Sequence, residues 1–312
     1  MGPLVVLTEK GKGSRAAKSV ASQRGIALVA VLWVILLLSL IAASISSTSR
    51  TELRIARNMI DAATVEAAAD GAVYQAVAGL VAQRGFPGDW RTDGTPRDLR
   101  IGDIEVTVSI QDEGGRIDLN TANRELLENA FRAAAPGSGE ALAAAVLDWR
   151  DSDDFVTPGG AEDPTYTGRG YPYGAKDAPF DSLDELRQVL GVTPQIFDRV
   201  SPLLTVYSGN RGVDPSVAPR EVLLAQPQFD ETIVEMILRA RTDAAEDGSS
   251  TAVGPPITTL TGQFSRTKRN AFAITAVAQS KTDTVFIREA VAYLTGGRDR
   301  LYSFLWWGKG RR

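Results

Sequence analysis

The sequence contains no cysteine and no histidine among its 312 residues. The first absence excludes disulfides and thiolate metal ligands. The second removes the usual general base and the commonest metal ligand. Catalysis by Ser-His-Asp or Cys-His groups is therefore excluded, and only carboxylates, Lys, Tyr and Ser/Thr remain for chemistry. The net charge of −4 indicates no particular partner for the chain as a whole.

Charge is also absent from residues 25–49. Residues 26–45 form a run of 20 almost entirely apolar positions, enough to cross a membrane core of roughly 30 Å as a helix. Five basic residues and a single acid precede this run, so the N-terminal side is predicted to stay in the cytoplasm. The sequence therefore predicts a single crossing with the body on the far side.

Three interpretations of this segment differ in how it is processed. A secretory signal peptide is disfavoured, because its apolar region would far exceed the usual ~7–15 residues. An uncleaved anchor is the second interpretation. In the third, Gln23-Arg24-Gly25 directly before the apolar run resembles the end of a prepilin-type leader. Residues 1–25 would then be a leader that is cleaved between Gly25 and Ile26.

The apolar run is predicted to continue as one helix, because no proline occurs between Pro3 and Pro87. Apolar or small residues recur at helical spacing, with a break around Asp70 and Gly71. They are Leu53, Ala56, Ile60, Ala63, Ala67, Tyr74, Val77 and Val81. Gly85-Phe86-Pro87-Gly88 is expected to end the helix, giving a segment 26–86 of roughly 90 Å. A face of small residues favours packing among other helices, and a simple spacer is the alternative.

Alternating residues beyond this helix predict a small antiparallel sheet. Residues 104–110 alternate apolar and polar side chains, as a half-buried strand does. Residues 271–279 and 284–294 read as two further strands joined by a turn at 280–283. The predicted class is α+β: a pilin-like long N-terminal helix packed on a small antiparallel sheet, with a large all-helical domain inserted in the sheet region.

The predicted insert, residues 113–264, is acidic and contains a weak repeat of helix pairs. Residues 111–260 hold 25 acidic and 12 basic residues, a net of −13. In the first pair, one helix is expected to open near Asn120–Asn123 and to lead to a second over 140–150. The second pair is expected over 182–204, where Gly191 ends one helix and Pro194 begins the next, and the third over 219–241. Helix-hairpin-helix units often bind nucleic acid, but that binding needs basic residues facing phosphates. We therefore expect no nucleic-acid partner.

The loop at 148–163 holds six carboxylates within 16 residues, interrupted by glycines. Such a loop can supply the oxygen ligands of Ca²⁺, although its spacing is not that of an EF-hand. A solvated acidic loop and a pair of catalytic carboxylates are the alternatives.

The order of these features resembles the minor pseudopilin K family of the type II secretion system. The resemblance is carried by Arg24-Gly25, by the span core 31–34, by Asp112–Ala122, by Asp148–Asp151, by 160–163 with Tyr166, and by 182–186 with Gly191. It covers nearly all of residues 24–295. Domains expected from it are a leader (1–25), a transmembrane and periplasmic helix (26–86), a first pilin-like sheet segment (87–112), the insert (113–264), a second pilin-like sheet segment (265–297) and a tail (298–312).

The resemblance implies a periplasmic body anchored in the inner membrane and cleavage with N-methylation of Ile26 by the prepilin peptidase. It implies a tip complex with minor pseudopilins I and J that initiates or caps the pseudopilus and supports protein export. Contact with secreted cargo or with the outer-membrane channel is also compatible with it. It implies calcium in the helical domain, for which Asp151, Asp153, Asp154, Glu162 and Asp163 are the candidate ligands.

One position adds a physical argument for the tip. Pilin-like subunits usually carry Glu at the fifth mature position, where this chain has Ala30. A carboxylate in the membrane core is costly unless it is paired, and the family pairs it with the N-terminal amine of a neighbouring subunit. A subunit with Ala there gives up that upward attraction and suits the top position.

The resemblance implies assembly rather than catalysis, so we expect a protein that is not an enzyme. Two competing functions remain. A minor pilin of a type IV pilus or of a DNA-uptake system would show a basic face. An anchored periplasmic enzyme would show a cleft with paired, perturbed acids. The tail, with Trp306-Trp307 and basic residues at its end, is expected to be disordered, with binding to a partner or to lipid as the alternative.

Overall fold

The computed structural model describes residues 21–82, 90–246, 270–297 and 299–310, without the side chains of 21–25, 47–49 and 244–246. The chain divides into two units, Met1–Ile60 and Asp61–Arg312, which are described separately. The elements are α1 (Ala21–Ala82), β1 (Arg97–Ile101), β2 (Ile104–Asp112), the 3₁₀ turn η1 (Glu113–Gly115), β3 (Ile117–Asp118), α2 (Arg124–Ala134), α3 (Gly139–Arg150), α4 (Asp163–Gly168), η2 (Leu183–Gln188), α5 (Pro194–Val200), η3 (Ser201–Leu203), β4 (Leu204–Thr205), α6 (Arg220–Leu224), α7 (Glu231–Glu246), β5 (Ala271–Gln279), β6 (Val285–Leu294) and β7 (Tyr302–Lys309).

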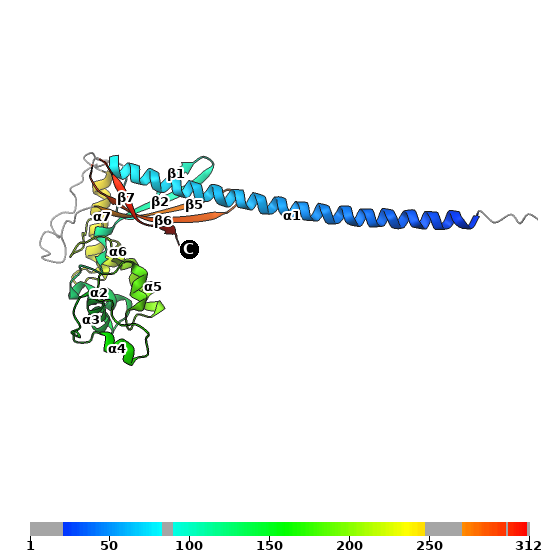
Figure 1. Cartoon of the computed structure of the whole chain (residues 1–312). Coiled ribbons are helices and arrows are strands. Elements are labelled where there is room, and N and C mark those ends of the chain that lie inside the picture. The colour runs from blue at the N-terminus through cyan, green and yellow to red at the C-terminus, as the bar shows by residue number, and fades with distance from the viewer. Residues whose placement is uncertain (1–20, 83–89, 247–269, 298, 311–312) are drawn as a thin grey trace, which may run out of the picture. The chain divides into compact units, whose positions relative to one another are not determined.

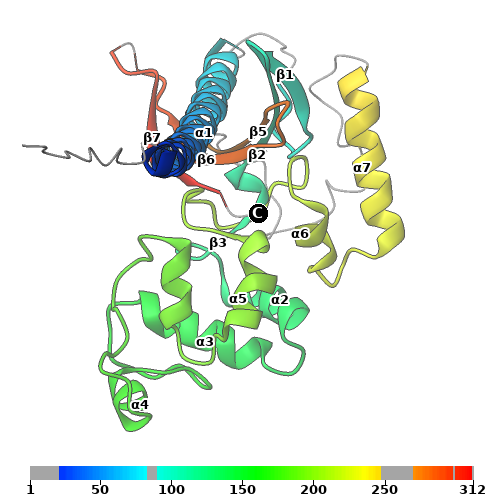
Figure 2. The same cartoon turned by 90° about the vertical axis from the view of Figure 1, so that its right-hand side faces the viewer.

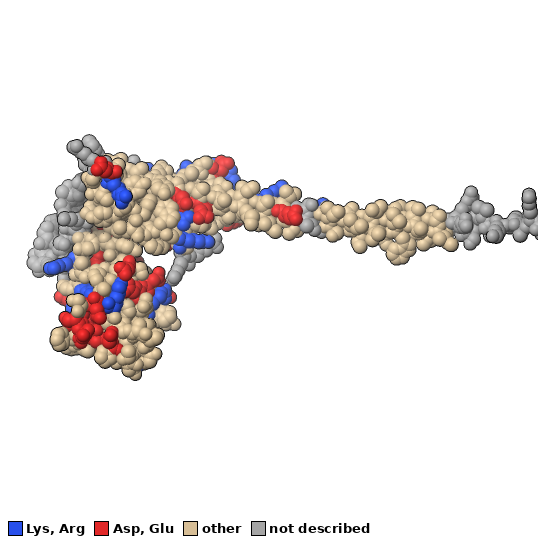
Figure 3. Space-filling view, in the orientation of Figure 1, with Lys and Arg blue, Asp and Glu red and all other residues tan. Residues whose placement is uncertain are grey.

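In the first unit, α1 is an apolar helix with its side chains exposed. Ile26–Ala82 is the one helix of the described residues that is long and apolar enough to span a membrane. The space-filling view shows no charged side chain along its apolar stretch (Figure 3). The predicted leader residues 1–20 and the predicted helix end at 85–88 lie outside the described residues.

The second unit contains a five-stranded sheet in the order β1-β2-β5-β6-β7, with antiparallel pairs throughout (Figure 1). The three predicted strands are confirmed as β2, β5 and β6. The turn after β5 contains Asp283, whose φ of 61° is left-handed. Strand β1 was not predicted. The expectation of a disordered tail is wrong, because residues 302–309 form β7, paired with β6 from Arg288 to Leu294.

The second half of α1 covers one face of this sheet (Figure 1). Small side chains meet there on both sides, so helix and strands can approach closely. The helix contributes Val65, Ala68, Ala69, Ala72, Val73, Ala76, Val77 and Leu80, and the strands contribute Val106, Val108, Ile110, Ile274, Ala276, Ala278, Ala290 and Ala292, among others.

The predicted apolar face of α1 is therefore only partly the one that meets the sheet. Val77 is buried, but Ala63, Ala67 and Tyr74 are exposed, as are Leu53 and Ile60. Helical spacing alone cannot distinguish the two faces, because both carry small or apolar residues. The helix consequently has a second apolar stripe, formed by Leu53, Ile60, Ala63 and Ala67, that its own sheet does not cover. Tyr74 is not part of it, because its ring lies 5.7 Å from Phe304 and 5.6 Å from Trp307 on β7, centroid to centroid.

The break in the helical pattern at Asp70 is explained by an ion pair with the sheet. The Arg288 guanidinium on β6 donates to Asp70 Oδ1 at 2.5 Å and to Glu66 Oε1 at 2.7 Å. The guanidinium also lies 5.2 Å from the centroid of the Trp307 ring on β7. Arg288 thus joins α1, β6 and β7 at one point.

The segment between β2 and β5 consists mainly of short helices around a second core. Its largest fully buried side chains include Phe131, Leu126, Leu127 and Tyr166. Figures 1 and 2 show α2, α3, α4 and α5 gathered away from the sheet. The expectation that the segment is all-helical needs correction, because β3 and β4 form a two-residue parallel ladder within it.

Three of the predicted helix-end residues are confirmed, whereas the helix-pair repeat itself stays a prediction. Asn123 caps α2 by accepting from the Leu126 amide, Gly191 has a φ of 87°, and Pro194 opens α5. The stretch around 183–188 is a 3₁₀ helix. The turn between α2 and α3 also contains a left-handed glycine, Gly137. Residues 247–264 of the predicted insert and 265–269 of the predicted second sheet segment lie outside the described residues.

Replacing Arg288 tests the joint between helix and sheet. Arg288→Ala should lower the free energy of unfolding by about 1–3 kcal/mol, because Glu66 and Asp70 would face each other without a cation. Arg100→Ala is the control, since its pair with Asp103 spans 3.8 Å at an exposed site and should contribute little. Denaturant unfolding of the full chain in micelles measures both. Equal losses in the two variants would contradict the assignment.

Candidate cation site

The acidic loop begins at Asp148, near the end of α3. Asp148 is fully buried, and both of its carboxylate oxygens accept from the Thr157 amide at 3.2 Å. Gly160 lies against it, since a Cβ on Gly160 would come 2.1 Å from Asp148 Oδ2. The loop from 151 to 160 therefore folds back over the end of α3, and a residue with a side chain would not fit at position 160.

Two further carboxylates of the loop each have one buried oxygen without a hydrogen-bond partner among the described residues. Glu162 is 2% exposed, and its Oε1 has no hydrogen-bond partner among the described residues. The same holds for Asp151 Oδ1. Burial raises the pKa of Glu162 to about 7, and the neighbouring carboxylates of Asp148 and Asp177 add to the shift. Burial, followed by Asp153 and Asp148, raises the pKa of Asp151.

The five predicted ligands occupy one region, which also contains two residues that were not in the predicted set. The negative charges of Asp151 and Asp154 raise the pKa of Glu162, that of Asp153 raises the pKa of Asp151, and that of Asp163 raises the pKa of Asp177. Asp148 and Asp177 are the additions. Asp177 has a left-handed φ of 54°, and burial raises its pKa, with Asp163 and Asp154 as the next causes. Figure 3 shows acidic side chains gathered over this region of the molecule.

An aromatic cluster packs next to the acidic loop. The Trp149 ring lies 5.8 Å from Tyr166 and 6.3 Å from Phe180, centroid to centroid. The indole of Trp149 donates to Glu185 Oε1 at 3.0 Å, and Lys176 binds the same carboxylate at 2.9 Å. The predicted motifs Asp148–Asp151, Tyr166 and 182–186 thus belong to one packed unit.

The donor set consists of carboxylate oxygens, which are ligands of hard divalent cations such as Ca²⁺. Buried carboxylates without partners fit such a cation, because it would supply the charge that burial removes from water. Within the described residues of the chain, however, no three acidic side chains converge closely enough to form a metal-binding group. The fit therefore rests on the electrostatics of the loop and on its two buried oxygens.

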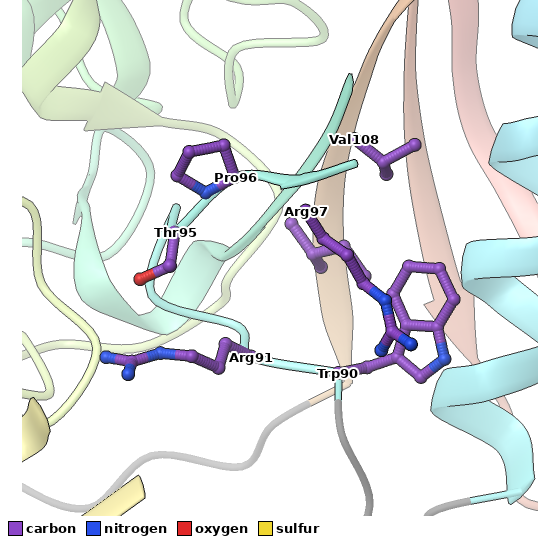
Figure 4. Close-up of a pocket in the computed structure, with 7 residues that line it drawn as sticks. Trp90, Arg91, Thr95, Pro96, Arg97 and Val108 are labelled. Carbon is purple, nitrogen blue, oxygen red and sulfur yellow. The ribbon is translucent and has the colours of Figure 1, made fainter. Parts of the chain in front are cut away.

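A cavity lies beside β1, and the enzymatic alternative would require paired acidic side chains in such a cavity. It has a volume of about 290 Å³ and is lined by Trp90, Arg91, Thr95, Pro96, Arg97, Val108 and Ile110 (Figure 4). Arg97 lies over the Trp90 ring at 4.7 Å, and Arg91 points away from it. No acidic side chain of the described residues lines this cavity, and the perturbed acids of the loop lie elsewhere. The predicted absence of catalysis stays a prediction.

The residues predicted for processing lie in α1. Ile26 and Ala30 are exposed helical residues, and Gly25 precedes them in the same helix. Nothing in the contacts of the described residues tests cleavage at this position.

The fold combines a long apolar N-terminal helix with an antiparallel sheet on which the second half of that helix packs, and the one apolar helix of the described residues fits a single-pass membrane anchor. Comparisons with known proteins agree. Residues 115–209 match the family model described as type II secretion system protein K. The chain is 28% identical over 204 residues to type II secretion system protein K of Pectobacterium carotovorum subsp. carotovorum and 26% identical over 204 residues to that of Klebsiella pneumoniae. The resemblance predicted from the sequence is confirmed: the chain is similar to type II secretion system protein K.

The sequence matches cover a smaller share of this chain than the structural match does. Each curated match covers 58% of this chain and 62% or 61% of the relative, so it spans about three fifths of the relatives' length. A chain from the crystal structure of the GspK-GspI-GspJ complex of enterotoxigenic Escherichia coli has the same fold. It aligns with a TM-score of 0.57 and 16% identity over 84% of this chain and all of that chain.

The pKa of Glu162 predicts how stability depends on pH. The folded chain holds this proton up to about pH 7, whereas the unfolded chain releases it near 4.5. With a chelator present, the free energy of unfolding should therefore fall as pH rises between these values. Glu162→Gln removes the buried charge and should stabilise the chain by on the order of 2–3 kcal/mol at pH 8, with little effect at pH 4. The exposed Glu140→Gln serves as control. A Glu162→Gln effect that is independent of pH would contradict the assignment.

Proposed function

We propose that the protein is a minor pseudopilin of a type II secretion system that initiates or caps the tip of the periplasmic pseudopilus and so supports protein export across the outer membrane. In this proposal α1 anchors it in the inner membrane, with a cytoplasmic leader and a periplasmic body. The observation that carries the proposal is the second apolar stripe of α1, which the chain's own sheet does not cover.

The exposed stripe is suited to packing with other helices. Ala63 and Ala67 are small enough to let two helix backbones approach closely, and Leu53 and Ile60 extend the stripe. The solved structural relative is a complex with GspI and GspJ. We therefore propose minor pseudopilins of the I and J types as the partners that cover this stripe. Secreted cargo and the outer-membrane channel are further candidates at the distal end.

The tip position is supported by the N-terminal end of the helix and by the size of the body. Ala30 lacks the carboxylate that would attract the amine of a subunit above, whereas the Ile26 amine remains for the subunit below. Residues 113–264 form, in our proposal, a domain inserted into the sheet region, and its bulk would obstruct a subunit stacked on top.

A minor pilin of a type IV pilus or DNA-uptake system is the alternative. The segment that would face DNA carries a net charge of −13 over residues 111–260. Phosphate contacts require basic side chains, so the charge favours the secretion role and argues against a nucleic-acid partner.

The helix stripe and the tip position can be tested together. Ala67→Arg places a charge in the stripe and should reduce co-purification with the I and J pseudopilins by about tenfold or more. Ala62→Arg is the matched control, since Ala62 is also exposed but lies about 140° around the helix from Ala67. Gold labelling of the body should mark one end of each pseudopilus. Labels at repeated positions along the shaft, or equal losses in the two variants, would reject the proposal.

We further propose cleavage by the prepilin peptidase between Gly25 and Ile26, with N-methylation of Ile26. The basic stretch before Gly25 and the apolar run after it support this assignment. Mass spectrometry of the membrane form should find a mature chain that begins with methylated Ile26. A chain that retains Met1, or one cut after Ala43, is the contrary result.

We also propose that the acidic loop binds Ca²⁺ through some of Asp151, Asp153, Asp154, Glu162 and Asp163, with Asp148 and Asp177 as added candidates. The buried oxygens of Asp151 and Glu162 support it. Millimolar Ca²⁺ should raise the melting temperature of the wild type at pH 8 by several degrees, and Glu162→Gln should weaken this response, since it removes one ligand charge. An equal response from both chains would exclude Glu162 as a ligand, and no response at all would remove calcium from the proposal.

A further inference from the structure

The sheet and the helical segment have separate hydrophobic cores. The core under α1 contains the inward residues of the sheet, and the other core contains residues of β3, β4 and the helices between β2 and β5. The two sets share no residue among those described. Apolar packing therefore does not join these two bodies, and their joint must be held in another way.

Hydrogen bonds to a single buried loop, residues 214–218, provide that joint. From the sheet side, Gln111 at the end of β2 donates from Nε2 to the Val217 carbonyl at 2.8 Å and to the Asp112 carbonyl at 2.9 Å. The Asp214 amide donates to the Gly114 carbonyl at 2.8 Å. The loop is thus bound directly to the end of β2 and to the turn η1.

The opposite side of the same loop is held by α7. Arg241, which is 8% exposed, donates from Nη1 to the Ala218 carbonyl at 2.8 Å and from Nη2 to the Pro215 carbonyl. The charge-assisted donation to two carbonyls fixes the loop from a rigid helix. Loop 214–218 is therefore held between strand β2 and helix α7.

Gly115 makes the contact close. A Cβ on Gly115 would lie 2.6 Å from the Val217 carbonyl oxygen and 2.8 Å from the Ala218 Cα. This explains the second glycine of the Glu113-Gly114-Gly115 motif, since any side chain would push the loop away. Beside the joint, a cavity of about 370 Å³ lies between Ser109 and Thr275 of the sheet and Pro202 and Pro219 of the helical segment. Because side chains do not fill this space, the hydrogen bonds of loop 214–218 determine how the sheet and the helical segment are arranged.

We propose that loop 214–218 is a lock that fixes the helical segment to the sheet as one rigid body, with Gln111, Gly115 and Arg241 as positioning residues. A buried polar network of this kind specifies one arrangement rather than adding much stability. Resting on the proposed pseudopilin role, the lock has a mechanical consequence. A force that α1 applies to the sheet is then transmitted to the helical segment, because no hinge motion occurs between the two bodies.

Distances between the two bodies test the lock directly. Because the chain has no cysteine, spin labels can be placed at Asp98→Cys on β1 and Glu140→Cys on α3 in the full chain in micelles. Arg241→Met should broaden the distance distribution by roughly twofold or more, and amide exchange at Asp214 should rise about tenfold. Arg239→Met, at an exposed position of the same helix, should change neither.

A second variant keeps the test valid if Arg241→Met fails to fold. Gly115→Ala should broaden the same distribution, with Gly168→Ala as control, since a Cβ at Gly168 meets nothing within 4 Å. An unchanged distribution in folded lock variants would overturn the lock, whatever the function of the protein. A broadened distribution with normal secretion would overturn its mechanical role. A broadened distribution with lost secretion and retained I and J binding is the expected result.

Discussion

The close docking of α1 on the sheet is the constraint on which the rest of the structure depends. Alanines on the helix and on β5 and β6 belong to one core, together with Val, Leu and Ile side chains, and a close-packed core of this kind tolerates little displacement of one layer against the other. Arg288 adds a directional contact, because its guanidinium fits only when Asp70 and Glu66 face β6. With one helix face fixed in this way, the opposite stripe is left for other helices.

The sequence predicted those elements of the fold whose patterns are local. Strands β2, β5 and β6 alternate buried and exposed residues, and Asn123 and Pro194 mark helix starts, so each was recognisable. Strand β7 was missed because Trp306 and Trp307 are adjacent and a bulge opposite Val291 and Ala292 interrupts its two-residue period. The orientation of α1 could not be predicted, because both of its faces are apolar and the choice between them is made by the sheet.

The acidic site was only partly visible in the sequence for a similar reason. Six clustered carboxylates stand out in a glycine-containing stretch, but Asp148 is not among the predicted ligands because it lies at the end of a predicted helix, over 140–150. Asp177 is distant in the sequence and reaches the site through the tertiary fold and a left-handed backbone. Its signal, a lone aspartate in a loop rich in glycine and proline, is too common to be informative. The joint at 214–218 depends on contacts between segments about 100 residues apart, which no local pattern reveals.

The pairing of β2 with β5 has a consequence for how the chain matures. About 160 residues separate these neighbouring strands, so the sheet cannot close until the whole intervening segment has been synthesised and has condensed on its own core. Until then the alanine face of α1 has only β1 and β2 to pack against, and apolar surface stays open to proteases and to aggregation. A chain truncated before β5 would keep this surface exposed permanently. The five-stranded order β1-β2-β5-β6-β7 is therefore completed only after the C-terminal strands have been synthesised.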